Sequence, residues 1–160
     1  GLGHRRILHI SGPRDNILGT SRLTGFRQAV AARGIEGLVI EGDFTMQSGA
    51  KAARDWAGMA DRPRAVFAAS DECAFGFMSE CAKMGIAVPG DVSVVGFDDV
   101  DFADRYIPAL TTIHQPRARL GRRAAESLIA ALTEGRPLPR TRELIEAHLV
   151  IRGSTSAAPR

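Results

Sequence analysis

The sequence lacks the features of a membrane or secreted protein. No apolar run approaches the length of a membrane-spanning helix. The first residues do not match a signal peptide, because Arg5 and Arg6 precede only a short apolar run. The two cysteines, Cys73 and Cys81, lie in a helical pattern that holds their Cα atoms about 12 Å apart, too far for a disulfide. We therefore expect reduced cysteines, a cytoplasmic location and no membrane partner.

Motifs of catalysis and of cofactor binding are also missing. The G-x-G of "GLGHRR" precedes a strand and has no third glycine, so it is not a dinucleotide fingerprint. There is no phosphate-binding G-x-x-x-x-G-K-[ST], no G-x-S-x-G and no Cys/His cluster. The four histidines lack metal-ligand spacing, and the acidic residues from Asp98 to Asp104 lack that of a calcium loop. The sequence predicts neither an enzyme nor a cofactor or metal site.

The composition is that of one soluble globular domain. The chain has 160 residues, of which 44% are hydrophobic and 24% charged. The net charge of +3 comes mostly from arginines scattered along the chain. Nucleic-acid binding usually gathers such charge on one face, so this is weak evidence for it within this chain.

Strand and helix patterns alternate along most of the chain. Apolar strands are predicted over residues 5–11, 37–43, 64–70 and 92–98, and helices over residues 20–34, 47–60 and 71–85. The strands are apolar on both faces and each connection carries a helix. The pattern therefore predicts an α/β fold, a parallel sheet in a three-layer sandwich.

The last third of the sequence has a different pattern. "ALTTIHQP" predicts a strand or a crossover, and residues 117–135 predict an amphipathic helix with Leu120, Leu128 and Leu132 in one stripe. "LIEAHLVIRGST" predicts a final strand. His148 in that strand is flanked by apolar residues, which favours a structural role over catalysis.

Polar and aromatic residues follow the predicted strands, at the edge where open parallel sheets bind ligands. They are Arg22, Phe44, Ser70 with Asp71, and Asp98. Asp98 can accept hydrogen bonds from neighbouring hydroxyls, Arg22 can donate several, and the Phe44 ring can cover an apolar sugar face. Each residue also has a simpler interpretation: Asp71 as a helix N-cap, Phe44 as core, Arg22 as a surface charge. Together they favour a site for a small polyhydroxylated ligand.

The predicted helix over residues 71–85 has two apolar stripes. Cys73, Phe77 and Cys81 lie in one, and Ala74 and Met78 lie in the other. One stripe is enough to cover the sheet. The second indicates either a second subunit, which we favour, or burial by the chain's own loops.

The ordered set of motifs resembles the LacI/GalR family of bacterial transcriptional repressors. The matching stretches are "LGHRRILHISGP", "SRLTGFRQAV", "EGDFTMQSG", "PRAVFAASDECAFGFM", "MGIAVPGDVSVVGFDD", "PALTTIHQP", "LGRRAAESLIAAL" and "EAHLVIRGST". They cover almost the whole chain. They match the C-terminal part of the effector (sugar)-binding domain.

The resemblance implies a periplasmic-binding-protein type I, Rossmann-like fold with two lobes and an effector in the cleft between them. Residues 1–113 and 143–155 would form the C-terminal lobe. Residues 114–142 would belong to the N-terminal lobe, with the rest of that lobe and the helix-turn-helix DNA-binding domain outside this chain. Without that lobe, we expect the helix of this segment to dock on another copy or to be displaced.

The resemblance also implies roles for particular residues. The effector-contacting positions fall on Arg22, Phe44, Ser70 and Asp98. Many family members carry Asn at the position of Ser70, whose single hydroxyl cannot reproduce an amide. The dimer interface would use the helix from about Glu72 to Lys83 and the loop from about Asp101 to Ile107, with Cys73, Phe77, Cys81 and Tyr106 in contact with the partner.

Two functions remain open from the sequence. The first is the effector-binding and dimerisation domain of a ligand-responsive transcriptional regulator, which binds a small sugar or related metabolite and reaches operator DNA through the absent helix-turn-helix. The second is a periplasmic sugar-binding protein of a transporter. An upstream helix-turn-helix favours the first, and an upstream signal peptide favours the second.

Overall fold

The computed structural model describes residues 2–135, 137 and 143–159. The helices and strands, in chain order, are β1 (Arg6–Ile10), α1 (Ile17–Ala31), β2 (Glu36–Ile40), α2 (Met46–Ala57), β3 (Ala65–Ala68), α3 (Asp71–Lys83), β4 (Ser93–Val95), β5 (Thr112–His114), α4 (Arg117–Glu134) and β6 (His148–Val150). No helix in these described ranges is long and apolar enough to cross a membrane.

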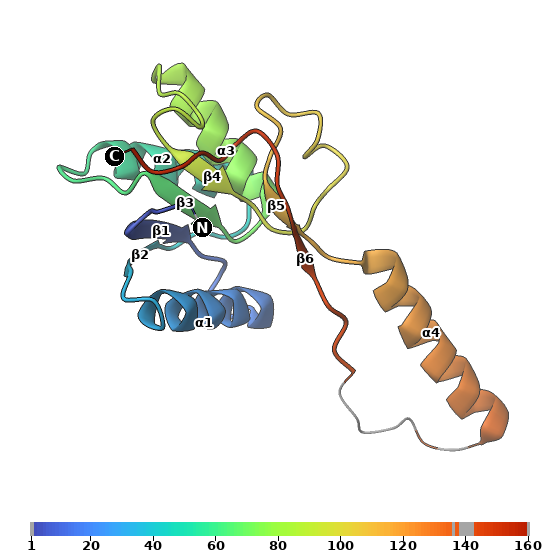
Figure 1. The fold of residues 1–160 in the computed structure, drawn as a ribbon. Helices are drawn as coiled ribbons and strands as arrows, with labels where there is room; N and C mark the ends of the chain where they lie inside the picture. The colour runs from blue at the N-terminus through green and yellow to red at the C-terminus, as the bar shows by residue number, and fades with distance from the viewer. Residues whose placement is uncertain (1, 136, 138–142, 160) are drawn as a thin grey trace.

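The first four strands form one parallel sheet in the order β2-β1-β3-β4. Helix α1 covers one face, and helices α2 and α3 cover the other (Figure 1). Leu8 and Ile10 of β1 lie in the core on the α2/α3 face together with Val66 and Val94 of the neighbouring strands. The predicted three-layer α/β fold is confirmed.

Helix caps differ from the sequence prediction at two places. α1 begins at Ile17, because the Asn16 side chain accepts from the backbone N–H groups of Leu18 and Gly19. The N-cap of α3 is Ser70, whose hydroxyl accepts from the N–H of Cys73 at 3.1 Å. The interpretation of Asp71 as an N-cap is therefore wrong, and its buried carboxylate has other partners.

Helices α2 and α3 pack against each other at backbone distance. A Cβ on Gly49 would overlap the carbonyl of Cys73, and one on Gly76 would overlap the carbonyl of Met46. Trp56 fills the space beside this contact, and its indole N–H donates to the Pro63 carbonyl at 2.8 Å. The glycines let the two helices form one rigid layer over the sheet.

Burial corrects the predicted interface on α3. Cys73, Phe77 and Cys81 are fully buried within the chain, so they pack its own core and not a second subunit. The loop after β4 covers the outer side of the helix: Tyr106 stacks on Phe75 with ring centroids 4.7 Å apart, and its hydroxyl donates to the Phe75 carbonyl at 3.2 Å. The alternative of burial by the chain's own loops describes this helix.

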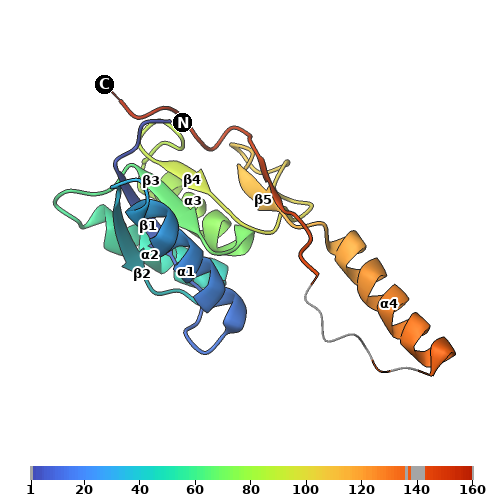
Figure 2. The same ribbon diagram turned by 60° about the horizontal axis from the view of Figure 1, so that its bottom comes forward.

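Strands β5 and β6 form a separate antiparallel pair beside β4. Helix α4 follows β5 and projects away from the sheet (Figures 1 and 2). No residue of α4 is buried, and Leu120, Leu128 and Leu132 are 42%, 49% and 74% exposed. Residues 136 and 138–142 of the predicted crossing segment lie outside the described residues.

His9 is a buried titratable residue in the centre of the sheet. Its ring stacks between Phe26 and Phe67, with centroids 4.9 and 4.8 Å away. Nδ1 donates to the Phe67 carbonyl at 2.9 Å, and Nε2 has no partner among the described residues. Burial lowers the pKa of His9 from 6.5 to about 4, so the neutral ring is the native form.

This burial predicts a pH-dependent stability. Between pH 6.5 and about 4 the unfolded chain binds a proton at His9 that the folded chain lacks. The free energy of unfolding should therefore fall as pH falls, by about 1.4 kcal/mol per pH unit from this residue. His9→Phe should remove that slope in urea denaturation curves, whereas His148→Gln, at an exposed histidine, should keep it. A His9→Phe variant with the wild-type slope would contradict the assignment.

Candidate functional site

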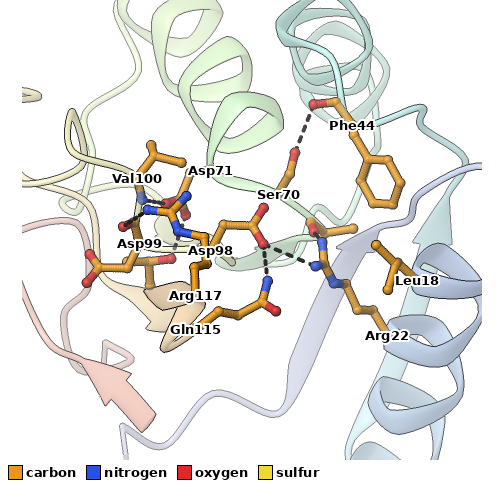
Figure 3. Close-up of polar contacts among 12 residues, drawn as sticks. Leu18, Arg22, Phe44, Ser70, Asp71, Asp98, Asp99, Val100, Gln115 and Arg117 are labelled. Carbon is orange, nitrogen blue, oxygen red and sulfur yellow. Dashed lines mark hydrogen bonds and ion pairs between the residues drawn. The ribbon is translucent and has the colours of Figure 1, made fainter. Parts of the chain in front are cut away.

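A cavity of about 320 Å³ opens at the carboxyl ends of the parallel strands. It is lined by Leu18, Arg22, Phe44, Ser70, Glu72, Asp98, Val100 and Gln115. The structure thus brings together all four of the ligand-binding residues predicted from the sequence. Figure 3 shows their side chains converging from α1 and from the segments that follow β2, β3 and β4.

Asp98 lies at the centre of this site. Its backbone has a φ of 123°, and its N–H donates to the Ile113 carbonyl at 3.0 Å. Arg22 and Gln115 both donate to Oδ1 (Figure 3). Oδ2 accepts no hydrogen bond from the described residues, so this oxygen is available to a ligand.

Arg22 is held on three sides. Nη2 donates to Asp98 at 3.1 Å, and Nη1 donates to the Ala69 carbonyl. The guanidinium carbon lies 4.1 Å from the ring centroid of Phe97 and 5.5 Å from that of Phe44. Because the side chain is only 11% exposed, the interpretation of Arg22 as a free surface charge does not hold. Its fixed position orients Asp98.

Phe44 and Ser70 form the opposite side of the cavity. Phe44 is half-buried and lies outside the core cluster, with a φ of 73°. Its ring lies against Gly12, where any Cβ would overlap ring atoms. The Ser70 hydroxyl donates to the Phe44 carbonyl at 2.8 Å while it accepts from Cys73. Ser70 can therefore only accept from a ligand.

Asp71 lies beneath the cavity and fixes the segment that carries Asp98. Its carboxylate accepts from the Thr112 hydroxyl and, at 2.9 Å, from the Val100 N–H. Burial raises the pKa of this carboxyl, and the nearby carboxylates of Asp98 and Asp99 add to the rise. Asp71 thus links α3, the loop after β4, and β5.

Asp99 faces away from the cavity, toward β5 and β6. It accepts from Arg152 at 2.7 Å and from His114 Nδ1 at 2.8 Å. Burial alone would raise the pKa of Asp99, but the hydrogen bonds from Arg152 and His114 outweigh it and hold the pKa below its usual value. The acidic cluster therefore divides into a cavity residue, Asp98, and an ion-pair anchor, Asp99. Asp101 and Asp104 are exposed.

Sequence reasoning missed half of the cavity. Gln115 lies in the quoted motif "PALTTIHQP" and follows β5 as Asp98 follows β4, so the strand-end argument would have found it if extended to this strand. Leu18 precedes Arg22 by one helical turn, which places both on one side of α1. Glu72 and Val100 were not predicted, because neither stands directly at the end of a predicted strand.

The other candidates for a functional site are a metal-ligand cluster, the cysteine thiols and a second cavity. Within the described ranges no group of three or more His, Cys, Asp or Glu residues is placed to hold a metal ion. Burial raises the pKa of both cysteine thiols to about 12, which makes them poor nucleophiles. A second cavity of about 800 Å³ lies between α1, β3 and β4. Its lining is mostly apolar, whereas polar groups converge in the smaller one.

Comparison with known proteins yields one consistent group. The model of the family described as periplasmic binding protein-like domain matches residues 1–155 of this chain. The HTH-type transcriptional repressor CytR of Escherichia coli K12 is 39% identical over 160 residues, which cover 98% of this chain and 47% of that protein. The described relatives are bacterial transcriptional regulators, not enzymes.

Solved structures agree with the sequence matches. A transcriptional regulator CelR–cellobiose complex is 41% identical with a TM-score of 0.87, and the match covers 95% of this chain and 47% of that one. A Lac repressor dimer bound to operator and the anti-inducer ONPF is 32% identical with a TM-score of 0.89, and the match covers 98% of this chain and 54% of that one. The chain spans about half the length of the relatives it matches.

The bond between Thr112 and Asp71 predicts a mutational effect. Thr112→Val keeps the side-chain shape but leaves the buried carboxylate of Asp71 without its hydroxyl donor. The free energy of unfolding should fall by about 1–3 kcal/mol, as measured by urea denaturation. Thr24→Val, at an exposed hydroxyl on α1, should change it by less than about 0.5 kcal/mol. Equal losses in both variants would mean that the buried bond adds nothing.

Proposed function

This chain belongs to the family of periplasmic binding protein-like domains, and we propose that it is the effector-binding and dimerisation part of a ligand-responsive DNA-binding transcriptional regulator. One observation carries the proposal. Asp98 is oriented by Arg22 and Gln115 at the strand-end edge, and its second carboxylate oxygen has no partner among the described residues. Such a pre-oriented acceptor in a cavity suits recognition of a ligand hydroxyl.

The ligand class follows from the two sides of the cavity. Leu18, Phe44 and Val100 offer apolar surface, and Ser70 and Asp98 offer acceptors. A sugar ring has an apolar face and a rim of hydroxyl donors, so a small carbohydrate or a related metabolite fits both sides. One similar structure is a complex with cellobiose, which supports this class without identifying the effector of this chain.

We assign residues 1–113 and 143–155 to one lobe and residues 114–142 to the opposite lobe. The sheet β2-β1-β3-β4 with its helices forms the first of these. The exposed apolar side chains of α4 support the second, because Leu120, Leu128 and Leu132 cover no sheet among the described residues. Binding of the ligand would then close the two lobes about a hinge at β5 and β6. This motion would change how a dimer presents its DNA-binding domains.

A periplasmic sugar-binding protein is the second candidate. The helix-turn-helix regulators among the relatives favour the first candidate. A regulator that binds operator DNA works in the cytoplasm, where buried Cys73 and Cys81 would stay reduced. The DNA contacts would come from a helix-turn-helix upstream of this chain.

Two substitutions test the site. Asp98→Ala removes the free acceptor, and Arg22→Ala removes the group that orients it. In the full-length protein that carries this chain, each should weaken effector binding by at least about thirtyfold in calorimetry. Asp61→Ala, at an exposed carboxylate outside both the cavity and the proposed dimer interface, should bind as the wild type does. Retained affinity in both site variants would reject the assignment.

A homodimer is part of the proposal, with a revised surface. The α3 residues Cys73, Phe77 and Cys81 are core, but the loop over residues 101–107 keeps apolar side chains at the surface. Phe102 is 57% exposed and Ile107 is 91% exposed, on either side of Tyr106. The similar Lac repressor structure is a dimer, which supports an interface without fixing its residues here.

A charge in this loop should separate the subunits. Ile107→Glu in the full-length protein should give monomers in light scattering, because a carboxylate would have to be desolvated at the interface. Ile17→Glu, an equally polar change at an exposed residue that begins α1, should leave the dimer intact. If the Ile107→Glu variant forms dimers over the same range of protein concentrations as the wild type, this loop is not the interface.

A further inference from the structure

The charges that line the cavity do not balance. Its lining holds one cation, Arg22, and two carboxylates, Asp98 and Glu72. Arg22 and Asp98 form an ion pair with atoms 3.1 Å apart. Glu72 is exposed and has no hydrogen-bond or ion-pair partner among the described residues. The cavity wall therefore has one negative charge in excess.

No other cation offsets this charge within the lining. Arg152 pairs with the Asp99 carboxylate at 2.7 Å, and Arg117 donates to the Asp99 backbone carbonyl at 3.2 Å. Neither residue lines the cavity. An acidic residue in the first turn of a helix is common, because it complements the helix dipole. That role alone would suit any face of α3, whereas Glu72 lies on the face toward the cavity.

The hydrogen-bonding groups left over in the cavity point the same way. Asp98 Oδ2, the Glu72 carboxylate and the remaining lone pair of Ser70 all accept and cannot donate. Arg22 directs one N–H of each terminal nitrogen to Ala69 and Asp98, and Gln115 directs one N–H of Nε2 to Asp98. These acceptors therefore favour a bound molecule that brings hydrogen-bond donors. Phosphate and carboxylate groups bring acceptors and negative charge.

We propose that Glu72 is a specificity-determining residue that makes this site select an uncharged, hydroxyl-rich effector and reject phosphorylated or carboxylated ones. This inference rests on the proposed function of the site. Hydroxyls of a neutral ligand donate to Asp98 and Glu72 together, from two sides. An anionic group in the same place meets two carboxylates, while Arg22 stays engaged with one of them.

The test uses matched pairs of compounds on the full-length protein that carries this chain. Suitable pairs are glucose and glucose 6-phosphate, cellobiose and cellobionate, and a nucleoside and its 5′-monophosphate. Thermal shift identifies which pairs bind, and calorimetry gives both affinities. The neutral member should bind at least about tenfold more tightly than its anionic partner, as expected for a like charge at close range.

Variants then assign this preference to Glu72. Glu72→Gln should move the ratio of the two affinities toward the anion by about tenfold, and Glu72→Lys should move it further. Asp61→Asn removes one negative charge, as Glu72→Gln does, but at the amino-terminal end of β1, beside Arg6. It should leave the ratio unchanged, which separates a local effect from the charge of the whole protein.

The outcomes distinguish this inference from the proposed function. If a ligand binds and Asp98→Ala abolishes its binding, the site is correct. If that ligand is the anionic member, or if Glu72→Gln and Glu72→Lys leave the ratio as it was, the role of Glu72 is wrong while the site stands. If binding survives Asp98→Ala, or if no compound of either charge binds, the proposed function fails and this inference fails with it.

Discussion

The parallel ladder of β2, β1, β3 and β4 is the constraint from which the site follows. Strands that run in one direction need a crossover between one strand and the next, and here α1, α2 and α3 provide it. Such strands also bring every carboxyl end to the same edge. Four residues far apart in sequence meet there: Arg22 from the helix that follows β1, and Phe44, Ser70 and Asp98 from the segments just after β2, β3 and β4. The core on the α2/α3 face keeps that edge fixed.

Sequence reasoning recovered what depends on periodicity and on order along the chain. Alternating strand and helix patterns identified the parallel sheet, and the strand-end rule selected four residues that the cavity contains. The resemblance to LacI/GalR repressors is confirmed by relatives of about 39–41% identity. The parallel sheet and the strand-end residues could be predicted, because each depends on neighbouring residues in the sequence and on strand direction.

Contacts between segments distant in the sequence could not be predicted in the same way. Asp71 has the spacing of an N-cap, but Ser70 takes that place and Asp71 bonds to Thr112, which lies in another strand. The apolar stripe of Cys73, Phe77 and Cys81 has the pattern of an interface, yet α2 and the loop after β4 bury the helix within one chain. The periodicity of a helix predicts which of its faces are apolar. It does not predict which segment or subunit packs against each face.

The absence of a partner for Glu72 among the described residues has an evolutionary consequence. An exposed side chain without such a partner is readily replaced, since a surface substitution of this kind changes the free energy of unfolding little. One nucleotide change converts a glutamate codon into one for glutamine or lysine. A regulator of this build could therefore change the charge of the molecule it senses while its sheet, its Asp98–Arg22 pair and its packed helices remain as they are. Signal recognition would then diverge faster than architecture.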